Sequence, residues 1–119
     1  MLRRKVTDRL LSWKNNSNKA LLVTGARQIG KSYAIRAFGQ SNYASYFEVN
    51  LLLDVEARNA LVGAKNSVDF INRVALLADA PLVEGDTLVF VDEIQEYPQI
   101  VTLMKALVED GRFSYVFSG

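Results

Sequence analysis

A glycine-rich segment ending in lysine and serine carries the clearest chemical pattern in the sequence. Residues 25–32 fit G-x-x-x-x-G-K-[ST] at every fixed position. A loop of this composition turns successive backbone N–H groups inward as a nest for phosphate oxygens, and the helix that follows adds its N-terminal N–H groups. Lys31 would supply positive charge to the terminal phosphates, and Ser32 would supply a hydroxyl oxygen to Mg²⁺. We expect the nucleotide to contact Gly25, Ala26, Arg27, Gln28, Ile29, Gly30, Lys31 and Ser32.

Two adjacent acids, Asp92 and Glu93, follow the apolar run at 88–91. Ligands of open α/β sheets bind at the carboxyl ends of the strands. At that edge Asp92 would bind Mg²⁺ through water, and Glu93 would polarise the water that attacks the terminal phosphate. An acidic pair after a buried strand is common by itself. Its occurrence downstream of residues 25–32 favours catalytic roles for Glu93 and Lys31.

Alternating strands and helices are expected to position these residues. Apolar runs predict strands at 20–24, 45–49, 87–91 and 113–117. Apolar periodicity and capping residues predict helices at 2–13, 31–38, 54–62, 66–77 and 98–108. Strands that alternate with helices indicate βαβ units. We therefore predict an α/β fold of the P-loop NTPase type, a three-layer sandwich with a mainly parallel sheet.

Composition narrows the range of functions. The chain has 119 residues, a net charge of +1, no cysteine and no histidine. This length fits one domain, residues 1–119, and the composition excludes cysteine nucleophiles, histidine bases and zinc sites built from these residues. No apolar run approaches the ~20 residues of a membrane span, so we expect no membrane partner and a cytoplasmic location. The near-neutral charge gives no support to general nucleic-acid binding.

The sequence favours ATP over GTP. No aspartate stands in an Asp-x-x-Gly pattern, and the nearest approach to a guanine-specific Asn-Lys-x-Asp, at 66–69, lacks the lysine. A metabolite kinase must present its acceptor and exclude water. A glutamate directly after the metal-binding aspartate is better suited to activating water, so hydrolysis is favoured over phosphate transfer.

Four segments together resemble a prokaryotic group of AAA-type ATPases: residues 25–32, Val-Asp-Glu-Ile-Gln-Glu at 91–96, Glu-Asp-Gly-Arg-Phe at 109–113 and Phe-Ser-Gly at 117–119. In that group a C-terminal domain of unknown function follows the ATPase domain. The resemblance implies ATP and Mg²⁺ as ligands, a fourth strand between the first and third, and a polar residue at its end, here Ser118, that senses the terminal phosphate. The family's fifth strand, lid and arginine finger are not found in this sequence. We therefore expect residues 1–119 to be a core that stops after the fourth strand.

The main hypothesis is Mg²⁺-dependent ATP hydrolysis by the AAA-type domain of a larger protein. Two alternatives stay open: a nucleotide-gated binding or switch module with little hydrolysis, and a DNA-processing ATPase. Besides ATP, the expected partners are a second copy of the chain or the C-terminal domain of the group. Gln95 is expected either to help hold the attacking water or to make a structural hydrogen bond, and Trp13 is expected to pack in the core.

Overall fold

A computed structural model describes residues 8–14, 20–23 and 31–119 of the chain. Residues 8–14 are helical, in agreement with the C-terminal half of the helix predicted at 2–13. The remaining elements are β1 (Ala20–Val23), α2 (Lys31–Asn42), β2 (Ser45–Asn50), α3 (Val55–Val62), α4 (Ser67–Leu77), β3 (Thr87–Asp92), the 3₁₀ helix η1 (Ile94–Glu96), α5 (Ile100–Asp110) and β4 (Ser114–Ser118). Each predicted strand and helix has a counterpart in this order.

The four strands form one sheet in the order β1-β4-β3-β2, and every neighbouring pair is parallel. The last strand in sequence therefore lies between the first and the third, as the resemblance implied. Parallel neighbours need a crossover connection, and the intervening helices supply it. The predicted α/β fold with a mainly parallel sheet is confirmed.

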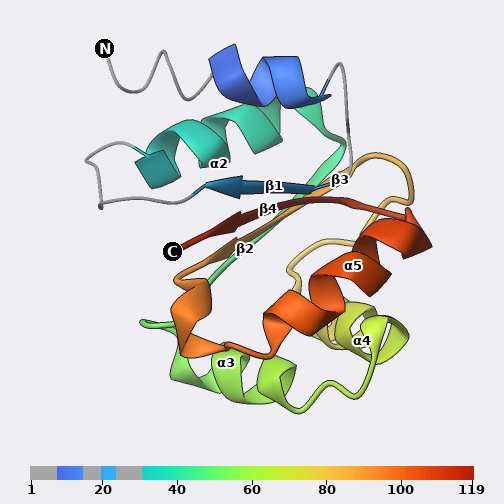
Figure 1. Cartoon of the computed structure of the whole chain (residues 1–119). Helices are drawn as coiled ribbons and strands as arrows, with labels where there is room; N and C mark the ends of the chain where they lie inside the picture. The colour runs from blue at the N-terminus through green and yellow to red at the C-terminus, as the bar shows by residue number, and fades with distance from the viewer. Residues whose placement is uncertain (1–7, 15–19, 24–30) are drawn as a thin grey trace.

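Helices cover both faces of the sheet and make it the middle of three layers (Figure 1). The helix at 8–14 and α2 lie on one face, and α3, α4 and α5 lie on the other. Alternate residues of a strand point to opposite faces. Leu88 and Phe90 of β3 consequently pack with the α2 layer, while Val89 and Val91 pack with the α3–α5 layer.

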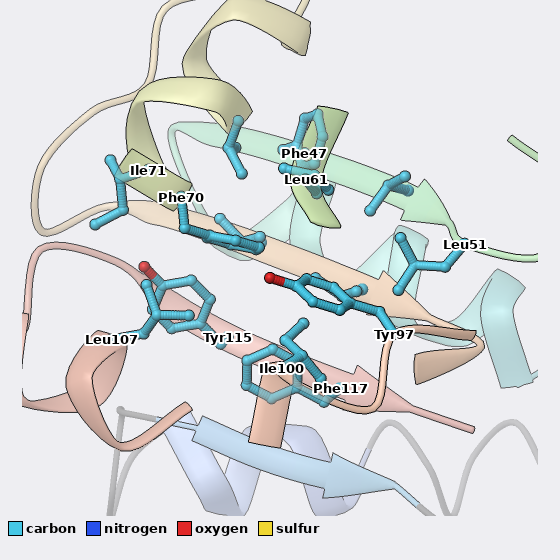
Figure 2. Close-up of a cluster of buried hydrophobic side chains, with 14 of the residues drawn as sticks. Phe47, Leu51, Leu61, Phe70, Ile71, Tyr97, Ile100, Leu107, Tyr115 and Phe117 are labelled. Carbon is cyan, nitrogen blue, oxygen red and sulfur yellow. The ribbon is translucent and has the colours of Figure 1, made fainter. Parts of the chain in front are cut away.

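The larger core lies between the sheet and α3–α5 (Figure 2). Its fully buried members include Leu51, Leu61, Phe70, Ile100 and Leu107. Fully burying one such side chain contributes about 1.5–3 kcal/mol, so this layer supplies most of the hydrophobic stabilisation. The smaller core on the α2 side contains Leu10, Trp13, Ile35, Phe38, Leu88, Phe90 and Val116. The prediction that Trp13 packs in the core is confirmed.

Local signals at the helix ends agree with the structure in two places. The Asn66 side chain accepts a hydrogen bond from the backbone N–H of Asp69 at 2.8 Å and caps α4. Gly111 ends α5 in the left-handed region, at φ 74°. Asn66 bonds to backbone three residues away, and Gly111 acts through its own backbone conformation. Such local effects can be predicted from the sequence alone.

Three details differ from the predictions. Helix α2 continues past Phe38 to Asn42, because Gly39 lets the helix pack directly on the ring of Tyr46; any Cβ at this position would overlap that ring. Helix α5 begins at Ile100 rather than at Pro98, because the short helix η1 and a turn come first. Val68 was predicted on the apolar face of α4 but is 51% exposed.

Candidate active site at the carboxyl edge of the sheet

The strand register brings the predicted site residues to one edge of the sheet. Ser118 at the end of β4 is aligned with Val23 of β1, and the preceding residue, Phe117, is aligned with Val91 of β3. Asp92 therefore ends β3 beside the end of β4. Alternation along each strand places Asp92 and Ser118 on the same face as Phe90, the face that α2 covers.

The first turn of α2 meets this edge. The Ser32 hydroxyl donates a hydrogen bond to Asp92 Oδ2 at 3.2 Å, although the two residues are 60 positions apart in sequence. Lys31 is the first residue of α2 and is half-buried. The other phosphate-loop residues predicted to contact nucleotide, Gly25, Ala26, Arg27, Gln28, Ile29 and Gly30, lie outside the described residues. The described end of the motif therefore contacts the acidic end of β3.

Asp92 and Glu93 are both buried, with 9% and 8% of their surface exposed. The second carboxylate oxygen of Asp92, Oδ1, accepts a hydrogen bond from the backbone N–H of Glu93 at 2.9 Å. Glu93 itself adopts φ 58° and ψ 50°, and it is the only described non-glycine residue with positive φ. Such a conformation costs a non-glycine residue on the order of 1–3 kcal/mol and is concentrated at functional sites.

The left-handed turn redirects the chain immediately after β3. The Glu93 carboxylate then accepts a hydrogen bond from the side-chain amide of Gln95, with 2.8 Å between Gln95 Nε2 and Glu93 Oε1. Gln95 was expected either to hold the attacking water or to make a structural hydrogen bond. A hydrogen bond of the second kind is present, to the carboxylate of Glu93. The sequence contained Gln95 at a suitable spacing, but no pattern indicated which group it would contact.

Ser118 is completely buried, and its hydroxyl has no hydrogen-bond partner among the described residues. Most buried polar side-chain atoms in proteins have such a partner, so each exception requires an explanation. A hydroxyl that is held beside Asp92 and the end of β1 is in a position to bond a ligand at this edge.

A polar network next to the site fastens α2 to the edge strand β2. Arg36 donates two hydrogen bonds to the Glu48 carboxylate, at 2.8 and 2.7 Å, and the Tyr46 hydroxyl donates a third at 2.8 Å. Burial opposes ionisation of Glu48, but the bonds from Arg36 and Tyr46 outweigh it and lower the Glu48 pKa. Burial, followed by the bond to Glu48, raises the pKa of Tyr46 well above its ordinary value, so the phenol stays protonated and remains a donor. The network holds α2, and with it Ser32, against the sheet.

Two further residues at this edge were missed by sequence reasoning. Asn50, aligned with Asp92, uses its side-chain oxygen to accept from the backbone N–H groups of Leu52 and Leu53, both at 3.0 Å. This bonding closes the turn beside the site. Gly119 lies against Gln95, because a Cβ at Gly119 would come within 2.5 Å of the Gln95 amide oxygen. An asparagine after a strand is a recognisable turn signal, whereas the need for glycine at 119 depends on contact with a distant segment.

In the described parts of the chain, no helix is long and apolar enough to cross a membrane. The same residues contain no cluster of three or more acidic, histidine or cysteine side chains that could enclose a metal ion.

Comparison with curated proteins finds no match. Comparison with protein-family models matches residues 17–119 to the AAA domain, a family of nucleotide-binding ATPases that generally use ATP and Mg²⁺. The matched range includes all four strands of the sheet and every residue of the candidate site. The chain therefore belongs to the AAA domain family.

Proposed function

We propose that this domain binds ATP with Mg²⁺ and hydrolyses its terminal phosphoanhydride bond. The observation that carries the proposal is the contact between the Ser32 hydroxyl and the Asp92 carboxylate, beside the buried Glu93. It unites the end of the phosphate-loop motif with the acidic strand end. Neither the phosphate-loop motif nor the acidic pair would by itself require this contact.

The oxygen donors at this edge fit Mg²⁺. Ser32 offers a hydroxyl and Asp92 a carboxylate, and oxygen ligands are those that Mg²⁺ prefers. Ser32 would bind the ion directly and Asp92 through water. A bound Mg²⁺ supplies positive charge to the phosphate oxygens. Lys31, at the N-terminus of α2, would add a mobile positive charge to the terminal phosphates.

Glu93 is proposed as the general base. As the attacking water forms its bond to the terminal phosphorus, its proton passes to the Glu93 carboxylate, and the bond to the bridging oxygen breaks to release ADP. Asp92 is assigned to the metal instead, because its carboxylate contacts the Ser32 hydroxyl that would bind Mg²⁺. Ser118 is proposed to bond the terminal phosphate, which would give its buried hydroxyl a partner.

The binding step is tested with Lys31→Ala. The side chain serves the ligand rather than either hydrophobic core, so the variant should fold normally and lose most of its affinity for Mg·ATP in calorimetry. Lys105→Ala removes an exposed lysine from α5, on the opposite face of the sheet, and should bind as the wild type does. An unchanged affinity in Lys31→Ala would contradict the phosphate-loop assignment.

A further inference from the structure

The side chain of Gln95 connects two parts of the site that are distant in sequence. Its amide nitrogen lies 2.8 Å from Glu93 Oε1. Its amide oxygen lies against the backbone at Gly119, directly after Ser118. A carboxylate can only accept hydrogen bonds, so the nitrogen must face Glu93 and the oxygen must face the end of β4. Gln95 therefore lies between the proposed base and the proposed phosphate-contacting strand.

The bond from Gln95 constrains the Glu93 carboxylate at a point that the backbone does not reach. The left-handed backbone and the bond from its N–H to Asp92 fix where the side chain begins. Three further torsions separate that point from the carboxylate, and ordering a long side chain costs conformational entropy. The bond from Gln95 engages one carboxylate oxygen and so restricts these torsions before any ligand arrives.

Gly119 is required by space rather than by backbone torsion. Its φ is not among the positive values in the described chain. A Cβ at this position would lie 2.5 Å from the Gln95 amide oxygen. It would also lie 3.0 Å from the Cγ1 atom and 3.1 Å from the backbone nitrogen of Ile94. The Gln95 amide oxygen is the far end of a flexible side chain, so a methyl group at 119 would displace it, and Ile94 would also have to shift by a few tenths of an ångström.

We infer that Gln95 is a positioning residue, which holds the Glu93 carboxylate in the orientation that activates water, and that Gly119 leaves the space in which Gln95 can do so. The inference rests on the proposed function, since it assigns a support to the proposed base. It also makes the orientation of the base depend on the end of β4, where Ser118 would contact phosphate.

Steady-state kinetics of the intact protein provide the first test. Gln95→Ala should lower kcat about tenfold and leave KM for ATP unchanged, because Gln95 acts on the base and not on the phosphates. Gly119→Ala should give the same kcat, and the double variant should be no slower than either single one. Gln99→Ala is the matched control: Gln99 is an exposed glutamine like Gln95, but it belongs to the adjacent turn and makes no capping bond with its side chain.

Gln95→Glu separates positioning from simple packing. It keeps the shape of the side chain but replaces the amide that donates to Glu93 with a carboxylate, which cannot donate when it is ionised. Gln95→Glu should therefore lower kcat at least as much as Gln95→Ala and leave KM for ATP unchanged.

A third readout needs no nucleotide. The side-chain amide of Gln95 should exchange its protons more slowly than that of Gln99 in NMR spectra of the ligand-free protein. This protection should disappear in both Glu93→Ala and Gly119→Ala. A wild-type kcat in the Gln95 variants, or an unprotected Gln95 amide in the wild type, would overturn the inference. If Glu93→Gln itself retains wild-type turnover, the proposed base is wrong instead, and the two failures are thereby distinguished.

Discussion

The two edges of the sheet use buried polar side chains in opposite ways. At the amino edge, where the strands begin, the Thr87 hydroxyl donates a hydrogen bond to the carbonyl of Val83 at 2.7 Å and accepts one from the N–H of Val83 at 2.8 Å. The Ser45 hydroxyl donates to the carbonyl of Pro81 at 3.0 Å. These bonds satisfy both hydroxyls with nearby backbone. At the carboxyl edge, the fully buried hydroxyl of Ser118 has no partner among the described residues, and Glu93 adopts a left-handed conformation.

Under the proposed function, the difference separates polar groups that stabilise the fold from polar groups that contact the nucleotide. A satisfied buried hydroxyl holds a turn in place, whereas an unsatisfied one costs free energy until something binds it. The contrast lies between Thr87 and Ser45, at the amino ends of β3 and β2, and Ser118, at the carboxyl end of β4. It predicts that substitutions at the amino edge change stability and that substitutions at the carboxyl edge change catalysis.

The largest effect is expected for Glu93→Gln at the carboxyl edge. This variant keeps the size of the side chain but cannot accept the proton of the attacking water. ATP hydrolysis should fall by ~10²–10⁴, the usual contribution of a general base, while Mg·ATP affinity stays close to that of the wild type. Phosphate release and calorimetry measure the two quantities. Wild-type turnover in this variant would place the base elsewhere.

At the amino edge, Thr87→Val should reduce stability without changing nucleotide affinity. The substitution keeps the β-branched shape but removes both hydrogen bonds to Val83. Each such bond contributes about 0.5–1.5 kcal/mol, so the free energy of unfolding should fall by about 1–3 kcal/mol in urea denaturation. A variant as stable as the wild type would show that these bonds do not hold the turn.

Ser118→Ala should give the opposite result. In the absence of nucleotide the variant loses no hydrogen bond to the described residues, so its unfolding free energy should stay the same or rise by about 1 kcal/mol, since a buried unsatisfied hydroxyl is removed. Its preference for ATP over ADP should decrease, because the proposed contact with the terminal phosphate is lost. Parallel denaturation and binding experiments on both nucleotides test this. If Ser118→Ala lost as much stability as Thr87→Val, the polar groups at the two edges would not differ in their contribution to the fold.

Sequence reasoning predicted the elements well because each depends on neighbouring residues. The apolar runs that became β2 and β3 and the capping residues Asn66 and Gly111 act over a few positions. The strand order came from the resemblance to AAA-type ATPases, since no local pattern specifies that the last strand lies between the first and third.

The site was predictable to the extent that its residues form motifs. Ser32 and Asp92 were expected at one place, and the structure brings them into contact. The conformation of Glu93, its bond to Gln95 and the space at Gly119 arise where η1 packs beside the end of β4. Such contacts between distant segments leave no periodicity or composition signal, so only the structure reveals them.

The smallest effect is expected at Glu48, in the middle of β2 and away from both edges. Its folded-state pKa is below the ordinary 4.5, because the bonds from Arg36 and Tyr46 outweigh burial. The ion pair therefore stabilises the fold at pH values above the unfolded-state pKa, and this contribution is lost as the pH falls through the lower folded-state pKa. The Arg36 side chain is 45% exposed, which limits the effect to below about 1 kcal/mol.

Glu48→Gln should remove the contribution of Glu48 to the fall in unfolding free energy at acid pH, which is called the acid limb here. Urea denaturation of the wild type and the variant from neutral pH down to pH ~3 should give a constant difference at neutral pH that narrows below the ordinary pKa of a glutamate. Arg36→Ala should flatten the limb in the same way, because it removes the main partner of the carboxylate, and high salt should weaken the difference. Identical acid limbs in all three proteins would mean that the network fastens α2 through Tyr46 and packing rather than through charge. The midsheet network would then resemble the amino edge, where neutral hydrogen bonds hold the structure.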